Sequence, residues 1–447
     1  MGRPAWLLTA ALMVVGLVAL CRRPAPEEPW RWSPSGMLAE AARYLDDPAF
    51  RRSELERSLV NPNNSYSRLR LENYGMGNRA WDLLPEWNPK SRELDDEQMK
   101  AIASGKSVDL TVTAPLWDGV RPTTMDAWIA LGREVFFRYP LRSEVFVEYA
   151  AKHPDEAARL GVLRTTGGRR PGFITFVDTD GRTNLGISCA LCHSNVVDGE
   201  LALGEARRSF DFGGLRLAHQ AATGSPIEPG LARRMRSWGP GRADVTEDDD
   251  EDPVAIPDLW GLRSQGHLTQ AGTIRQDGPV ALALRQETQL LTSNHQRVRP
   301  PRALAFALAA FVYSLTPPAK SRDPSSEEAS AKGKKLFQTH CARCHGNGAL
   351  GGDLVAQGSV ETDGALAHGA ARGTGRYRPP SLLRVDRAAP YFHHGAVRTL
   401  EDVLDPARLE AGFTGGALRP GPVPGHTYGT ELPKPARDEL VAYMKSL

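Results

Sequence analysis

The strongest constraint in the sequence is a five-residue motif that occurs twice. Cys189 and Cys192 are followed directly by His193 in CALCH, and the same order of residue types returns at 341–345 in CARCH. The chain has five cysteines, so these motifs use four of them and leave only Cys21. A fold that explains this chain must give both cysteine pairs and both adjacent histidines a role.

Paired cysteines serve three kinds of chemistry. A disulfide within C-x-x-C, or a zinc site formed by both pairs, leaves the histidine after each pair unexplained. C-x-x-C-H is instead typical of covalent c-type haem, in which two thiols bond to the porphyrin and the histidine binds iron. We therefore predict two covalent haems, with His193 and His345 as iron ligands. The attachment points are Cys189, Cys192, Cys341 and Cys344.

Length and charge set broad limits. The chain has 447 residues, of which 41% are apolar and 24% charged, which is enough for two or three domains with their own cores. The formal net charge is +2, so no basic excess points to nucleic acid as a partner.

The N-terminus carries a targeting signal. Arg3 precedes an uncharged run, 4–20, which is typical of a signal-peptide core and slightly short for a membrane span. We therefore predict residues 1–23 to be a signal peptide or an N-terminal anchor, with the rest periplasmic or otherwise outside the cytoplasm. Lipidation of Cys21 stays open, because Leu20 is larger than the residue expected before that cleavage.

The two halves of the chain repeat each other beyond the motif. ALGREVFF at 130–137 matches AKGKKLFQ at 331–338, and AAFVYSL at 309–315 matches VAYMKSL at 441–447, all with helical patterns. Each motif therefore lies between two predicted helices.

An insertion and a matched segment complete the comparison. Residues 170–184 precede the first motif and predict two strands joined by a turn. Downstream, 257–272 and 380–395 have equal length and matching proline, leucine and glycine positions. The acidic run 244–252 could bind calcium or a basic partner, but a solvated loop is favoured.

The predicted fold is mainly α, with two cytochrome c-like domains, each with a covalent haem, and an N-terminal extension. The predicted parts are an extension at 24–120, an N-terminal domain with insertion at 121–318, a linker at 319–330 and a C-terminal domain at 331–447.

With the repeat established, residues 376–404 closely resemble the corresponding stretch of bacterial di-haem cytochrome c peroxidases and their relatives, and the resemblance covers roughly 125–447. It implies that hydrogen peroxide reacts at the N-terminal haem, with electrons relayed through the C-terminal haem from a small cytochrome c or copper protein (cupredoxin). The relatives also include a methylamine-dehydrogenase maturation enzyme and a rubber-cleaving dioxygenase, so the superfamily does not fix the substrate.

The C-terminal haem departs from the peroxidase pattern. The family's axial methionine falls at Ala407, and the only methionine after Cys341 is Met444. Segment 425–430, GHTYGT, resembles the rubber-oxygenase-like branch, which favours His426 as the second iron ligand. The alternatives are His368, His393, His394 and Tyr428.

The resemblance also suggests catalytic residues in the N-terminal half. His219 is the nearest analogue of a movable distal histidine, with helix-face packing as its alternative. Glu287 falls near the family's distal glutamate, which transfers protons, but a structural salt bridge is an equal alternative. His267 and His295 could also block the iron. Gln270 stands where the family has a tryptophan between the haems.

Three functions remain at this point. Peroxide reduction is favoured over electron transfer alone and over a haem-dependent oxygenase. The sequence leaves dimerisation open.

Overall fold

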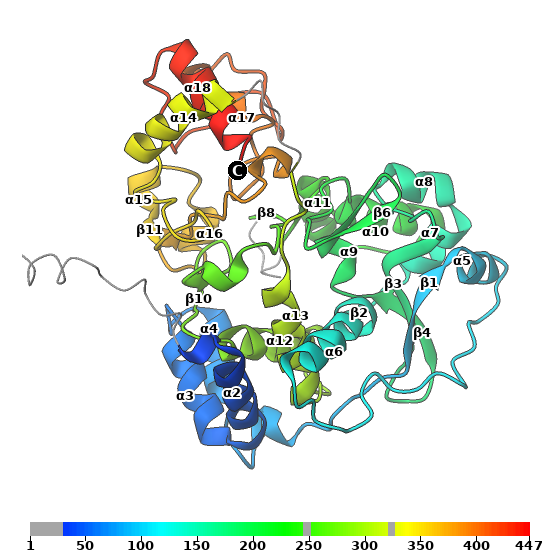
Figure 1. Cartoon of the computed structure of the whole chain (residues 1–447). Helices are drawn as coiled ribbons and strands as arrows, with labels where there is room; N and C mark the ends of the chain where they lie inside the picture. Colours follow the sequence, from blue (N-terminus) through cyan, green and yellow to red (C-terminus); the bar gives the residue numbers. More distant parts are fainter. Residues whose placement is uncertain (1–29, 245–251, 321–326) are drawn as a thin grey trace, which may run out of the picture.

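The computed structural model describes residues 30–244, 252–320 and 327–447, and these parts are largely helical (Figure 1). The predicted targeting segment 1–23 and most of the acidic run 244–252 lie outside the described residues. In the described ranges, no helix is long and apolar enough to cross a membrane.

The helices and strands fall into three groups along the chain. The extension contains α2 (Pro34–Asp46), α3 (Pro48–Ser58), α4 (Ser65–Asn73), β1 (Ser91–Asp95) and α5 (Asp96–Ala103). The N-terminal half contains α6 (Met125–Arg138), β2 (Arg142–Ser143), α7 (Phe146–Lys152), α8 (Pro154–Arg159), β3 (Arg169–Val177), β4 (Thr183–Ile187), α9 (Ala190–His193), β5 (Ser194–Val197), β6 (Glu200–Leu203), α10 (Phe212–Thr223), α11 (Pro229–Trp238), β7 (Arg242–Ala243), β8 (Val254–Ala255), β9 (His267–Leu268), β10 (Ile274–Arg275), α12 (Val280–Ser293) and α13 (Arg302–Ser314). The C-terminal domain contains α14 (Glu327–His340), β11 (Val355–Ala356), α15 (Gln357–Val360), α16 (Ala365–His368), β12 (Arg376–Tyr377), the 3-10 helices η5 (Val385–Arg387) and η6 (Pro406–Leu409), α17 (Leu400–Leu404) and α18 (Lys434–Met444).

In the N-terminal half, α6 and α13 cross at a glycine. A Cβ added to Gly132 would lie 1.9 Å from the carbonyl oxygen of Ala307, so only glycine lets the two backbones approach this closely. One turn away, the rings of Phe136 and Phe311 are 5.2 Å apart. The crossing is therefore fixed by a small residue and an aromatic pair.

In the C-terminal domain, α14 and α18 cross in the same way. A Cβ on Gly333 would lie 2.0 Å from the carbonyl oxygen of Glu439, and the rings of Phe337 and Tyr443 are 5.3 Å apart. Each residue occupies the position of its N-terminal counterpart in the repeat. Both halves thus contain the same helix crossing, while the domain boundaries themselves stay a prediction.

The insertion before the first motif forms an antiparallel hairpin, which confirms the predicted strand pair. β3 pairs with β4 from Phe173 opposite Ile187 to Val177 opposite Thr183. The sequence did not indicate β1, which adds to the other edge of β3 in a four-stranded sheet of order β1-β3-β4-β2. The extension, expected to be helix and loop, therefore completes this sheet.

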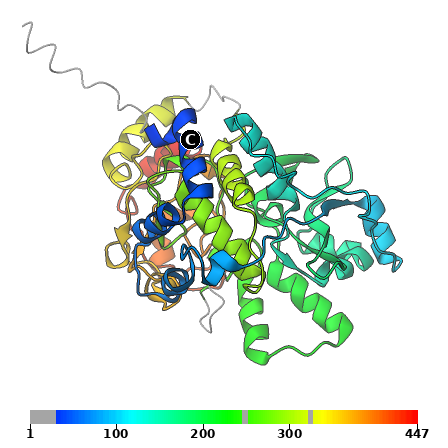
Figure 2. The same cartoon turned by 90° about the horizontal axis from the view of Figure 1, so that it is seen from below.

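The helices of the extension cover the N-terminal half. Figures 1 and 2 show α2 and α3 lying against α12 and α13. The extension also reaches the C-terminal domain, because the backbone N–H of Ser65 donates to the Ala370 carbonyl at 3.0 Å. It therefore contacts both halves.

Candidate functional site

The second cysteine motif forms a single turn at the end of α14. The backbone N–H groups of Cys344 and His345 both donate to the Cys341 carbonyl, at 3.1 and 3.0 Å. All three side chains line one cavity of about 900 Å³. Both thiols and the imidazole therefore line a cavity that is large enough for a cofactor.

The His345 ring is held by the backbone. Its Nδ1 lies 3.0 Å from the Leu350 carbonyl oxygen, so Nδ1 donates there and the other nitrogen, Nε2, is left as an electron-pair donor. Burial lowers the pKa of His345, which keeps the ring neutral. This is the state in which histidine binds a metal.

His426 lines the same cavity as His345. Burial lowers the pKa of His426 to about 4, and the nearby His345 ring adds to the effect. The His426 backbone is fixed, because its N–H donates to the Val360 carbonyl at 2.6 Å and Arg408 donates to its carbonyl at 2.8 Å. Within the described residues its Nδ1 has no hydrogen-bond partner. A partly buried, neutral histidine whose buried Nδ1 has no hydrogen-bond partner among the described residues suits metal ligation.

The remaining distal candidates have other surroundings. His368 is exposed and lies 3.3 Å from the Gln357 side-chain oxygen. His393 lines the cavity but stacks on Tyr377, with ring centres 4.2 Å apart. The Tyr428 hydroxyl donates to a backbone carbonyl at 2.8 Å.

Ala407 and Met444, the two positions considered for a methionine ligand, differ in burial. Ala407 is exposed on η6, so the family's methionine position does not face the cavity in this chain. Met444 is buried in the core with Phe337 and also borders the cavity.

The first cysteine motif is built in the same way at α9. The backbone N–H groups of Cys192 and His193 donate to the Cys189 carbonyl at 3.3 and 3.2 Å, and His193 Nδ1 lies 3.2 Å from the Pro257 carbonyl oxygen. Burial lowers the pKa of His193 to about 4. The side chains of Cys189, Cys192 and His193 are each partly buried.

The two motif histidines contact prolines at equivalent positions of the sequence repeat. Pro257 opens the segment 257–272, and its counterpart Pro380 opens 380–395. The backbone of Pro380 also interacts with the His345 ring. The matched prolines therefore lie beside the matched histidines.

Glu287 lies in a buried network formed with the extension. Its carboxylate accepts hydrogen bonds from the Tyr44 hydroxyl at 2.5 Å and from the Tyr74 hydroxyl, and it lies 3.2 Å from Arg302 Nε. Burial raises the pKa of each tyrosine well above the usual value, and the negative charge of Glu287 raises it further. A structural role for Glu287 is therefore supported by specific partners. The proton-transfer role of Glu287 stays a prediction.

The histidines proposed to face the first iron are spread out. His219 on α10 packs edge-on against Tyr149, with ring centres 6.1 Å apart. His295 is exposed on a turn. His267 is partly buried on β9, and in the described chain its Nδ1 has no hydrogen-bond partner. No contact of His219 with His193 is seen among the described residues, so its catalytic role stays a prediction.

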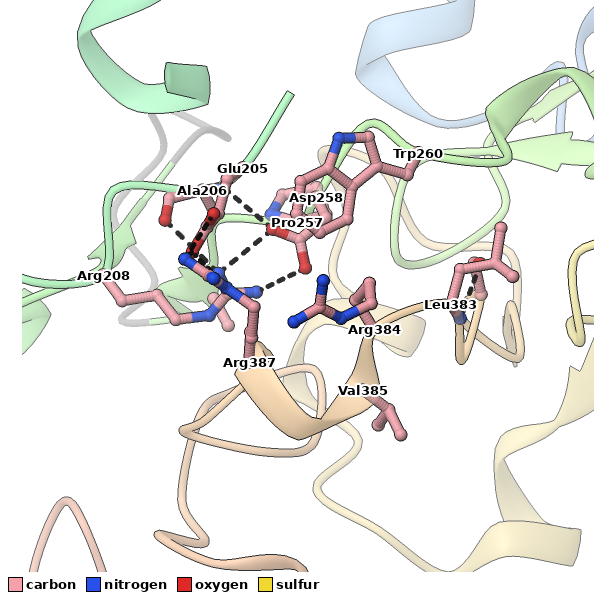
Figure 3. Close-up of polar contacts among 12 residues, drawn as sticks. Glu205, Ala206, Arg208, Pro257, Asp258, Trp260, Leu383, Arg384, Val385 and Arg387 are labelled. Carbon is pink, nitrogen blue, oxygen red and sulfur yellow. Dashed lines mark hydrogen bonds and ion pairs between the residues drawn. The ribbon is translucent and has the colours of Figure 1, made fainter. Parts of the chain in front are cut away.

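Two residues near the boundary of the halves border the 900 Å³ cavity. Gln270 donates to the Ala255 carbonyl at 3.3 Å. Trp260 is buried, and its indole N–H donates to the Leu203 carbonyl at 2.8 Å. Figure 3 shows Trp260 on the same stretch of chain as Pro257 and Asp258.

Two fully buried arginines were not anticipated from the sequence. Arg207 Nε donates to the Ser194 carbonyl at 3.1 Å, beside the first motif. Arg408 donates to the Val423 carbonyl at 2.6 Å and to the His426 carbonyl, beside the second. Both arginines donate hydrogen bonds to backbone carbonyls. Such partners cannot be identified from a sequence pattern, because every residue has a backbone carbonyl.

Comparisons with known proteins agree with the C-terminal site. A family model described as cytochrome c matches residues 330–447. Among solved structures, the chain is similar to one described as the crystal structure of a MauG-like protein associated with microbial copper homeostasis. The sequences are 22% identical, the match covers 48% of this chain and 79% of that chain, and the TM-score is 0.31. No curated protein matches the chain. Residues 330–447 therefore form a cytochrome c domain, which implies at least one covalent c-type haem in this chain.

Proposed function

We propose that this chain is an exported cytochrome with two covalent haems that reduces hydrogen peroxide at the haem of the N-terminal half. The observation that best supports it is the shared construction of the two motifs. Each ends in a histidine whose Nδ1 faces a backbone carbonyl, and each half has a helix pair that crosses at a glycine. Since the second motif lies in a cytochrome c domain, the first suits a second haem.

The residues of the C-terminal cavity fit a haem. Cys341 and Cys344 would form the thioether bonds, and His345 and His426 would be the axial ligands. Much of the remaining wall is apolar and includes Phe337, Val360, Leu400, Val403 and Leu404. A bound haem would supply an iron that gains and loses one electron at a time.

In this proposal the two halves have different roles. With His345 and His426 both binding the iron, the C-terminal half would suit relay of electrons from a small cytochrome c or a cupredoxin. In the N-terminal half, His219 packs on Tyr149 and His295 is exposed, which supports access of peroxide to an iron held by His193. His267, whose Nδ1 has no hydrogen-bond partner among the described residues, is the remaining histidine that could block that iron. Peroxide would react there, outside the cytoplasm.

Electron transfer without catalysis is the second candidate. It is favoured by the Glu287 network, because hydrogen bonds from two tyrosines and a neighbouring arginine are also what a purely structural carboxylate would have. Under this alternative the N-terminal haem is also closed to peroxide.

The test is steady-state reduction of peroxide by the purified di-haem protein, with a reduced small cytochrome c as electron donor. We expect turnover, and we expect Glu287→Gln to slow it by roughly 100-fold at unchanged haem content, because general acid catalysis contributes that much. Glu97→Gln, an exposed carboxyl of α5, is the matched control and keeps full activity.

Two outcomes would contradict parts of this proposal. Absence of turnover in the wild type would favour the electron carrier. Full activity of Glu287→Gln would remove Glu287 from the mechanism and leave it a structural role.

A further inference from the structure

Residues 203–208, here called the connecting segment, are bound directly to the first cysteine motif. The backbone N–H of Gly204 donates to the His193 carbonyl at 3.0 Å, and that of Arg207 donates to the Cys192 carbonyl at 2.9 Å. The connecting segment therefore follows any movement of the motif backbone.

The connecting segment also holds the chain that receives the His193 ring. The Leu259 N–H donates to the Gly204 carbonyl at 2.8 Å, and the Ala206 N–H donates to Asp258 Oδ1 at 2.8 Å. Both bonds hold the two residues that directly follow Pro257, whose carbonyl lies 3.2 Å from His193 Nδ1. Both ends of the histidine hydrogen bond are thus fixed by the same six residues.

Side chains strengthen this arrangement. Arg208 pairs with Asp258 through contacts of 2.7 and 3.0 Å (Figure 3). The Trp260 indole donates to the Leu203 carbonyl. A Cβ on Gly204 would lie 2.9 Å from the Trp260 indole nitrogen, so the packing here is close. Little room is left for the segment to shift.

A single ion pair joins the connecting segment to η5 of the C-terminal domain. One terminal nitrogen of Arg387 lies 2.8 and 2.9 Å from the two carboxylate oxygens of Glu205 (Figure 3). The Glu205 side chain is only 4% exposed, so its charge is largely removed from water. Asn195, in the strand after the motif, also donates to Glu205 at 3.2 Å.

We propose that Glu205 and Arg387 are positioning residues that couple the C-terminal domain to the iron ligand His193. The proposal rests on the proposed function, because it requires a haem at the first motif. Removing Arg387 leaves the buried Glu205 carboxylate without its charged partner and with only the neutral Asn195 amide, so the connecting segment shifts to rehydrate it. The bond from His193 to Pro257 then weakens.

The expected effect is on the reduction potential. A hydrogen bond from Nδ1 makes the imidazole a more basic ligand, which favours oxidised iron. Weakening that bond raises the potential. We expect about a tenfold change in the equilibrium constant for reduction of the N-terminal haem, which is 59 mV for a one-electron couple.

The experiment is a potentiometric titration of Arg387→Met, followed by optical and electron paramagnetic resonance (EPR) spectra that separate the two haems. Arg384→Met is the matched control, because Arg384 lies just before η5 but pairs with Asp386 and donates to the Pro318 carbonyl, not to the connecting segment. We expect the N-terminal potential to shift in Arg387→Met and to stay at the wild-type value in Arg384→Met. Arg387→Lys, which keeps the charge, should shift it less.

Other results overturn the proposal and show which part fails. Two haems with the N-terminal potential unchanged in both Arg387 variants would remove the coupling and leave the proposed function intact. One haem per chain would remove the proposed function together with the coupling. If Arg387→Met does not fold, Arg387→Lys decides, and an N-terminal potential equal to that of wild type contradicts the proposal.

Discussion

The two cysteine motifs share a frame but differ in what surrounds them. In both halves a glycine-centred helix crossing is combined with a histidine bound to a backbone carbonyl. Around His345 there is a cavity that a second histidine, His426, also lines. Around His193 the chain adds a hairpin, a connecting segment and an extension that binds Glu287. The shared frame suits attachment of a haem, and the differences suit one relay site and one reactive site.

The largest expected effect concerns the difference between the sites. Replacing His426 with alanine removes the proposed second ligand, so the C-terminal haem should change completely from low-spin to high-spin while the N-terminal signal is kept. EPR of the oxidised protein measures this. His368→Ala, at an exposed histidine, is the control and should change nothing. A low-spin spectrum in His426→Ala, with the change appearing in His393→Ala instead, would move the ligand to His393.

The next prediction tests what the halves share. Gly132→Ala and Gly333→Ala each place a methyl group within about 2 Å of backbone across a helix crossing. Each should lower the free energy of unfolding by about 3 kcal/mol, the upper range for overpacking. Urea unfolding measures the loss.

Gly358 supplies the control for these variants. It lies in α15 with open space around it, so Gly358→Ala should gain roughly 0.5–1 kcal/mol from helix propensity. A large loss at Gly333 with none at Gly132 would show that the crossings are not equivalent.

The smallest expected effect is the contribution of one histidine of the C-terminal domain, His394, to the pH dependence of stability. Burial lowers the pKa of His394 to about 4 from its ordinary value of 6.5. Between these values the unfolded chain binds a proton that the folded protein does not, so stability falls as the pH drops below 6.5. By pH 5 the loss is about 2 kcal/mol.

The measurement is urea unfolding at pH 7 and pH 5. His394→Gln should lose about 2 kcal/mol less stability than the wild type over this interval. An equal loss in both proteins would contradict a buried, neutral His394.

Local patterns in the sequence predicted much of the frame. The helix patterns at 130–137 and 331–338 lie in α6 and α14, and the alternation in 170–184 gave the hairpin. These features depend on neighbouring residues, so spacing reveals them. Ala407, where the resemblance places the family's methionine, is exposed on η6, and the identity of the second iron ligand stays a prediction.

Contacts between distant residues could not be predicted in this way. Tyr44 and Glu287 are separated by more than half of the chain. β1 (Ser91–Asp95) also lies far in sequence from β3 (Arg169–Val177), so the two strands meet only when the chain folds. The buried arginines bind backbone carbonyls, which every residue has. Charge and spacing give no signal for such partners, so the connecting segment and the Glu287 network emerge only in three dimensions.

The most direct test of the two-site account is EPR of the purified di-haem protein, first oxidised and then half-reduced, before and after peroxide is added. The account predicts a high-spin ferric signal from the N-terminal haem that disappears with peroxide, beside a low-spin signal from the C-terminal haem. Two low-spin haems in both states, with no response to peroxide, would contradict it and identify an electron carrier.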